Sequence, residues 1–187
     1  MSEKTKKIVG IGLFTAIVIV LQAMAITIRF GIFNISLVLI PIVVGAALYG
    51  PLAGAWLGLI FGVVVLFTDA SLFLAVNVLG TILTCIVKGA VAGYVAGIVY
   101  KAFEKKNRIL AVVMAAIVAP ICNTGIFLIG CKLFFLETVT GWATAAGYAN
   151  VGKFMIFGLV GLNFLIEMGI NVVLSPVIVR LIKIGKK

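Results

Sequence analysis

Polar side chains recur at helical spacing within two strongly apolar stretches of this 187-residue chain. In an α-helix, residues separated by four, seven, eight or eleven positions lie on one face, so each set forms a polar stripe. Such stripes are costly inside a membrane and usually face a bundle interior or a cavity, where they contact ligands or neighbouring helices. The first stripe is Asn77, Thr81, Thr84 and Lys88, and the second is Asn163, Glu167 and Asn171.

Seven polar residues are the candidates for contact with a small-molecule ligand, because they lie on or near the stripes and towards the expected outer face. Interhelical hydrogen bonds are the alternative role for the asparagines and threonines, and snorkelling to the membrane surface is the alternative for the lysine near a helix end. The predicted binding residues are Asn77, Thr81, Asn123, Lys132, Asn150, Lys153 and Asn163.

Deeper in the expected spans, Glu167 and Asn171 favour a structural role. At a rise of 1.5 Å per residue, Lys88 lies roughly 16 Å below the outer start of its helix and Glu167 lies about 20 Å below the start of its own. The two charged side chains can therefore meet as an ion pair. Such a pair fixes the register of two helices without contacting a ligand.

Enzyme chemistry is not expected from this sequence. It contains no histidine, which is the commonest general base, and no GxxxxGK[ST], HExxH or GxSxG motif. The cysteines Cys85, Cys122 and Cys131 lie in predicted spans without CxxC spacing and are interpreted as small buried apolar residues. No metal and no cofactor are predicted, and the single acidic residue deep in a span gives little material for an ion relay.

The elements that carry these residues are expected to be membrane helices. The chain is 64% hydrophobic and 11% charged, which leaves too little polar surface for a water-soluble domain. A span needs about 20 apolar residues, so there is room for about six helices. The second is too short to cross upright and is expected to be tilted, bent or partly re-entrant. The predicted helices cover about residues 7–28, 36–48, 51–68, 77–103, 109–135 and 154–182.

Glycine recurs at four-residue spacing in two of these helices, at positions 50, 54, 58 and 62 and at positions 89, 93 and 97. Each ladder leaves one helix face without side chains, which favours close helix packing in lipid. Glycine inside a soluble helix costs about 1 kcal/mol relative to alanine, so the ladders favour a membrane bundle. One ladder is expected to pack inside the domain, and the other is available as a sliding face for a partner.

Basic residues predict the orientation. Lysine and arginine gather at the N-terminus, between the fourth and fifth helices and at the C-terminus, all on one side if there are six crossings. The positive-inside rule makes that side cytoplasmic. We therefore expect a single all-α integral membrane domain over residues 1–187, with six spans, both termini inside and no cleaved signal peptide. The net charge of +10 is interpreted as a topology signal, and nucleic-acid binding is not expected.

Residues 34–62, NISLVLIPIVVGAALYGPLAGAWLGLIFG, resemble the second and third helices of the substrate-binding S components of energy-coupling factor (ECF) vitamin transporters. The helix number, the internal termini and the chain length are similar to this family as well. Family members carry a small-xxx-small signature on the first helix, where the coupling subunit docks. Its nearest match here is Gly12 with Ala16, in which glycine replaces the first alanine of the usual pair.

The resemblance implies a vitamin receptor in the bacterial plasma membrane that works with a membrane coupling subunit and two cytoplasmic ATPases. The ligand would lie near the outer face, under the loops at about residues 29–35, 69–76 and 137–152. The receptor would topple in the membrane to deliver it inward. A stand-alone secondary carrier or channel is the alternative from a different class.

Among vitamins, residues 37–51 most resemble the pantothenate group, with pyridoxine or riboflavin as alternatives. Pantothenate carries a carboxylate, an amide and two hydroxyls, which suit a basic residue such as Lys132, Lys153 or Arg29 combined with asparagines. A flavin would favour aromatic stacking, for which the sequence offers Phe73, Phe134, Trp142 and Tyr148.

Overall fold

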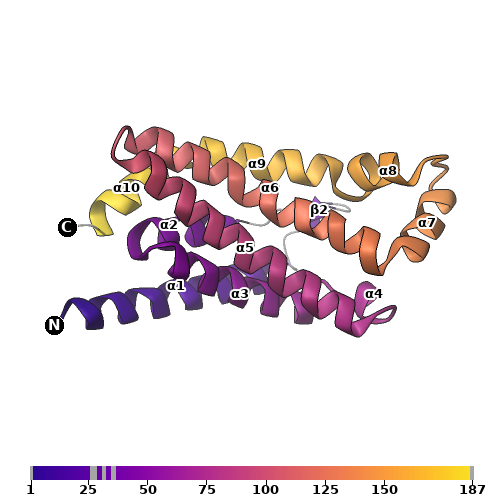
Figure 1. The fold of residues 1–187 in the computed structure, drawn as a ribbon, viewed down its shortest axis with the longest axis horizontal. Helices are drawn as coiled ribbons and strands as arrows, with labels where there is room; N and C mark the ends of the chain where they lie inside the picture. Colours follow the sequence, from indigo (N-terminus) through magenta and orange to yellow (C-terminus); the bar gives the residue numbers. More distant parts are fainter. Residues whose placement is uncertain (1, 26–28, 31–32, 35–36, 186–187) are drawn as a thin grey trace.

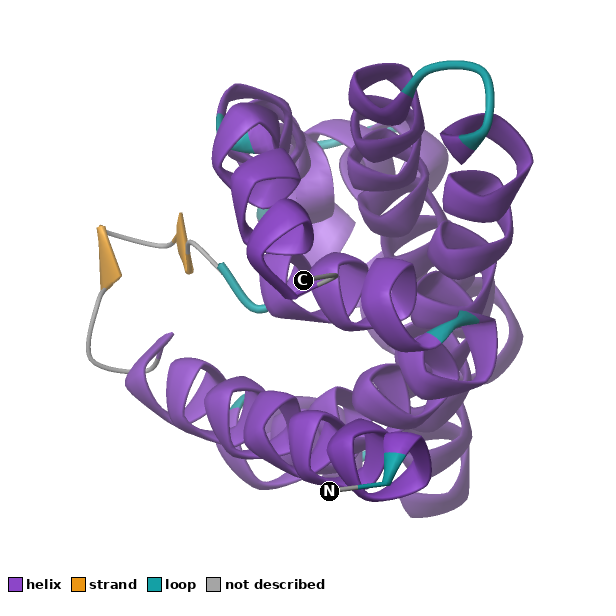
Figure 2. Ribbon diagram, turned by 90° about the vertical axis from the view of Figure 1, so that its left-hand side faces the viewer, coloured by secondary structure: helices purple, strands orange, loops and turns teal. Residues whose placement is uncertain are grey.

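The computed structural model describes residues 2–25, 29–30, 33–34 and 37–185, and within these residues the regular structure is helical apart from one short strand pair. The two strands β1 (Arg29–Phe30) and β2 (Phe33–Asn34) pair antiparallel and lie to one side of the helices (Figure 2). The helices are α1 (Glu3–Ala25), α2 (Leu39–Tyr49), α3 (Pro51–Thr68), α4 (Ser71–Leu74), α5 (Val78–Glu104), α6 (Arg108–Phe134), α7 (Leu136–Ala145), α8 (Val151–Lys153), the π-helix η1 (Phe154–Gly161), α9 (Leu162–Val173) and α10 (Ser175–Gly185).

The long helices run along a common direction and divide the molecule into two ends (Figure 1). Both chain termini and the connection between α5 and α6 lie at one end, whereas α4 and α7 lie at the other. The basic residues near the termini and between α5 and α6 therefore gather at the same end, as the sequence predicts. The end with α4 and α7 therefore lies opposite the basic end of the molecule.

Four of the described helices, α1, α3, α5 and α6, are long and apolar enough to cross a membrane. The segment 151–173 forms a fifth candidate as a broken span, with a bend of 44° between its two parts. The short helix α2 is apolar and mostly buried, and it packs against α3, α5, α6 and α10. The structure therefore supports a helical membrane bundle, and six crossings stay a prediction.

The last predicted helix, residues 154–182, differs from the structure, which divides this stretch into η1, α9 and α10. The first break follows two glycines, Gly158 and Gly161, which lower helix stability. The second break precedes Pro176, in the first turn of α10, where a proline ring is compatible with the start of a helix but not with its interior. The hydrophobic pattern alone does not reveal these interruptions.

The two glycine ladders pack against each other and hold α3 and α5 together. A Cβ atom built on Gly54 would collide with the carbonyl oxygen of Gly93, and one built on Gly58 would collide with that of Gly89. A Cβ on Gly62 would likewise meet the backbone of Cys85. Both ladders are thus occupied inside the protein, which corrects the expectation that one of them is a free face for a partner.

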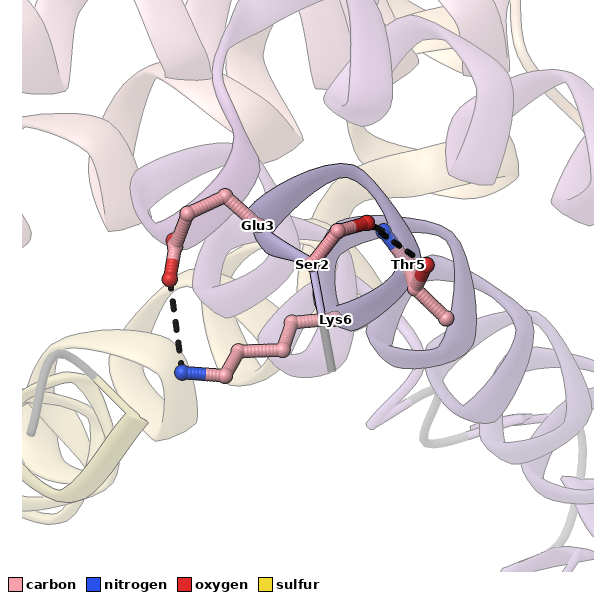
Figure 3. Close-up of polar contacts among 4 residues, drawn as sticks. All are labelled: Ser2, Glu3, Thr5 and Lys6. Atoms are coloured by element: carbon pink, nitrogen blue, oxygen red, sulfur yellow. Dashed lines mark hydrogen bonds and ion pairs between the residues drawn. The ribbon is translucent and has the colours of Figure 1, made fainter.

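Helix α1 begins with a local cap and is tied to α3 at its far end. The Ser2 hydroxyl accepts a hydrogen bond from the Thr5 backbone N–H at 3.2 Å, and Lys6 lies 3.3 Å from Glu3 in an exposed ion pair (Figure 3). At the other end, the Gln22 side chain donates to Asp69 at 2.8 Å. Most of the intervening surface of α1 is exposed, including Gly12 and Ala16.

The ladder contact predicts that Gly58→Ala destabilises the protein by about 1–3 kcal/mol, because the added methyl group must push α5 away from α3. Gly125→Ala is the matched control, since a Cβ at Gly125 meets no atom within 4 Å. The control should be neutral or stabilising by up to about 1 kcal/mol, the difference in helix propensity. Thermal unfolding of the purified proteins in one detergent measures both. Equal stability of Gly58→Ala and wild type would contradict this packing.

Candidate ligand-binding cavity

A cavity of about 670 Å³ lies between α6 and the η1–α9 segment, with further walls from α4, α5 and the segment before α8. This volume is within the range of roughly 300–1,000 Å³ that is usual for small-molecule sites. Its lining combines five polar or charged side chains with a tyrosine, four phenylalanines and small or aliphatic residues. The polar members are Lys88, Asn123, Thr124, Asn163 and Glu167, and the aromatic members are Phe73, Phe127, Tyr148, Phe157 and Phe164.

Lys88 is held between aromatic rings. Its ammonium nitrogen lies 5.3 Å from the centre of the Phe127 ring and 5.9 Å from that of Phe61. Both distances are within the range of a cation–π interaction, which partly compensates a positive charge that has left water. Lys88 is one of the residues that line the cavity, so its positive charge is available to an anionic ligand group.

Glu167 lies on α9 and also lines the cavity, with its residue only 8% exposed. Among the described residues, no ion pair within 4.0 Å joins Glu167 to Lys88. The structure therefore does not form the register-fixing ion pair that the sequence made possible. Instead, a cationic and an anionic side chain line the same small-molecule space, and neither is neutralised by the other at contact distance.

Asn123 and Asn163 supply amide groups from α6 and α9. The side-chain oxygen of each is buried without a hydrogen-bond partner among the described residues. Asn163 directly follows the bend of 44° that ends the π-helical segment. A π-helix is rare and frequently marks a functional site. Both residues line the cavity, so their amide groups are candidates for hydrogen bonds with a ligand.

The end of the cavity nearest α7 is aromatic. Phe73, on the short helix α4, packs edge-to-face against Phe127, Phe135 and Trp142, with ring centres 5.6, 5.0 and 5.5 Å apart. These ring contacts join α4, α6 and α7 at the end of the molecule opposite the termini (Figure 1). Edge-to-face pairs add packing energy beyond simple burial. The cavity thus has an aromatic end near α4 and α7 and a charged part that extends towards the middle of the helices.

The other predicted binding residues do not line this cavity. Asn77 caps the start of α5, where its side chain accepts a hydrogen bond from the Gly80 N–H at 2.9 Å, and the buried Thr81 hydroxyl donates to the Asn77 carbonyl at 2.7 Å. Asn150 likewise caps α8 by accepting from the Lys153 N–H at 3.1 Å. The side chains of Lys132 and Lys153 are exposed.

Sequence reasoning therefore placed two of the cavity's polar residues, Asn123 and Asn163, among the candidates. It recognised Lys88 and Glu167 as deep charges but assigned them to structure, and it did not select Thr124. The signal that could have found the charges is their depth, because an ionisable residue far inside a span is a functional candidate by default. The side chains of Arg29 and Asn34, in the first predicted ligand loop, lie outside the described residues.

The bundle and the cavity beside α6 and α9 together indicate a helical membrane protein with space for a small molecule. Comparison with protein families identifies it further, because the model for the ECF transporter substrate-specific component matches residues 6–179. The chain belongs to this family, whose members are vitamin-type substrate-binding subunits of transporters and not a class of enzymes. Searches of curated proteins and of solved structures gave no match.

The different positions of two asparagines give a direct test. Asn77→Ala removes a helix cap and should lower the free energy of unfolding by about 1 kcal/mol with unchanged affinity for ligand. Asn163→Ala removes a cavity amide and should weaken binding at least about tenfold, or 1.4 kcal/mol. Calorimetric titration with candidate vitamins and thermal unfolding measure the two effects. An equal loss of affinity in both variants would contradict the placement of the site.

Proposed function

We propose that this protein is the substrate-specific subunit of an ECF-type importer and that pantothenate is its ligand. The observation that supports this most is the cavity of about 670 Å³, which combines one lysine, two amides with buried, unpartnered oxygen atoms and one carboxylate. A ligand with one anionic group and several hydrogen-bond donors is complementary to that set of side chains. Pantothenate has a carboxylate, an amide and two hydroxyls.

In this proposal, Lys88 binds the vitamin carboxylate by a charge-assisted hydrogen bond, the strongest polar contact that the cavity can offer. Asn123 and Asn163 accept hydrogen bonds from the vitamin amide and hydroxyls, and Glu167 accepts one from a hydroxyl at the other end of the ligand. The phenylalanine rings pack against its methyl groups. The unequal polar groups at the two ends of the ligand fix its orientation.

Riboflavin or pyridoxine is the second candidate. The observation that favours a flat aromatic ligand is the lining by Phe73, Phe127 and Tyr148, since exposed ring faces offer stacking surfaces. Neither of these vitamins carries a carboxylate, so neither uses the charge of Lys88 in the same way. The dependence of binding on that charge therefore separates the candidates.

We further propose that the termini and the α5–α6 connection lie in the bacterial cytoplasm, so that the cavity's aromatic end faces outward. The clustering of basic residues at one end of the molecule supports this orientation. The membrane coupling subunit and two cytoplasmic ATPases then supply the energy that this chain has no nucleotide motif to provide. Gly12 and Ala16 are the proposed docking positions on α1, where both residues are exposed and a Cβ at Gly12 meets no atom within 4 Å.

Substitution of Lys88 tests the ligand assignment. Wild type should bind pantothenate at least about tenfold more tightly than panthenol, in which a neutral alcohol replaces the carboxylate. Lys88→Met should lose this preference, because the charge that distinguishes the two compounds is gone. Lys101→Met is the matched control, since this exposed lysine lies on the same helix at the other end of the molecule.

Calorimetric titration of the three proteins with both compounds gives the affinities. Equal affinity of wild type for pantothenate and panthenol would contradict the role of Lys88, and tight binding of riboflavin or pyridoxine alone would favour the second candidate. If Lys88→Met still preferred pantothenate over panthenol by the wild-type factor, the carboxylate of the vitamin would bind at another residue.

Substitution of Gly12 tests the docking proposal. Gly12→Leu should keep pantothenate affinity but weaken co-purification with the coupling subunit, because a branched side chain then fills the small-residue face where close helix contact is needed. Gly169→Leu is the control, as its position on α9 is equally open.

In proteoliposomes, sustained uptake by this chain alone would support the stand-alone carrier and contradict the importer subunit.

A further inference from the structure

A second space, an apolar groove of about 470 Å³, lies between α6 and the η1–α9 segment. From α6 it is lined by Ile121, Thr124, Gly125 and Leu128, and among the remaining residues are Phe157 and Phe164. Thr124 is the one residue with a polar side chain in the lining. The groove therefore offers contact surface to a hydrocarbon rather than to a polar ligand.

The groove lies at membrane depth. Ile121 is roughly 20 Å along the axis of α6 from Arg108, at a rise of 1.5 Å per residue, which is the middle of this candidate span. Residues at its edges are open to the surroundings, with Ile121, Ile156, Phe157 and Leu165 between 47% and 69% exposed. Around such positions the solvent is hydrocarbon, because the apolar core of a bilayer is about 30 Å thick.

The groove also adjoins the ligand cavity. Five residues line both spaces: Thr124, Phe157, Val160, Gly161 and Phe164. At these positions the wall between lipid and the cavity that holds Lys88 and Glu167 is a single residue thick. Three of the five residues belong to the η1 segment, where the π-helix and its glycines interrupt regular helix packing.

We propose that the groove is a binding site for one acyl chain of a membrane phospholipid, and that this chain completes the wall of the ligand cavity. An empty groove would forfeit dispersion contacts with its lining residues, whereas a flexible hydrocarbon chain can fill an apolar space of this volume. A partner helix is too large for the groove, because two turns of a helix about 10 Å across already have a larger volume than the groove. Gly125 gives the chain its room, since a Cβ built there meets no atom within 4 Å.

The acyl chain has a consequence for the receptor. A polar ligand next to Lys88 and Glu167 must be kept apart from the bilayer core, and the thin wall at Phe157 and Phe164 is reinforced by a chain packed on its outer side. This site is independent of which vitamin the cavity binds.

Photolabelling tests the proposal. The probe is phosphatidylcholine with a diazirine at the middle of one acyl chain, incorporated into nanodiscs with the full-length protein, and peptide mapping locates the labels after illumination. The expected result is strong labelling of residues 121–128 and 156–165, above the level at the exposed Phe67 of α3, which is 86% exposed. Labelling that is uniform over all lipid-facing helices would mean ordinary surrounding lipid only and would overturn the proposal.

Gly125→Leu provides the matched variant, because leucine fills the groove without a backbone collision. Labelling of the groove should then fall about tenfold, as for a tenfold loss of affinity, while Gly169→Leu should label like wild type. Unchanged labelling in Gly125→Leu would overturn the site. The wild-type labelling map decides the question even if Gly125→Leu does not fold.

Pantothenate titration of Gly125→Leu in lipid-free detergent separates the lipid from the alternative occupant. If the affinity of Gly125→Leu for pantothenate is within about twofold of wild type, the vitamin does not occupy the groove and the lipid assignment holds. A loss of about tenfold would mean that the vitamin occupies the groove, and would overturn the acyl-chain site. Because labelling is measured without vitamin, failure of the pantothenate assignment would leave the labelling result unaffected.

Discussion

The close backbone contact between α3 and α5 is the constraint on which the rest of the structure depends. Lipid chains are as apolar as leucine, so helices in a bilayer gain little from burying large apolar residues and associate through close packing. Gly54, Gly58, Gly89 and Gly93 allow the two backbones to meet with no side chain between them. This contact fixes the position of α5, and through it the depth at which Lys88 enters the ligand cavity.

Much of this arrangement can be predicted from the sequence because it follows from local patterns. Spans α3, α5 and α6 follow from apolar runs of sufficient length, and α3 was expected over its observed residues 51–68. The pairing of the two ladders was not predicted, because four-residue spacing identifies a packing face but not the helix that covers it. The breaks around η1 were also missed, since glycine weakens a helix without specifying whether that helix bends.

The candidate site was predicted in part for a related reason. A polar residue near a helix end has two physical uses, to cap unpaired backbone N–H groups or to bind a ligand, and the sequence does not distinguish them. Asn77 and Asn150 serve as caps in the structure, whereas Asn123 and Asn163, within spans, line the cavity. Depth in the membrane separates the two groups, because backbone caps are needed only at helix ends.

The depth of Lys88 and Glu167 in the spans also favours a role in ligand binding over a role in fixing helix register. Two opposite charges that fixed helix register would gain most by direct contact, since each charge is expensive to remove from water. Here the cation lies between two aromatic rings and the carboxylate lines the same cavity without forming that contact. Because Lys88 and Glu167 do not contact each other, each charged group is available to interact with a ligand. A bound ligand with complementary ends can interact with both, and the tight α3–α5 contact keeps Lys88 in place while it does so.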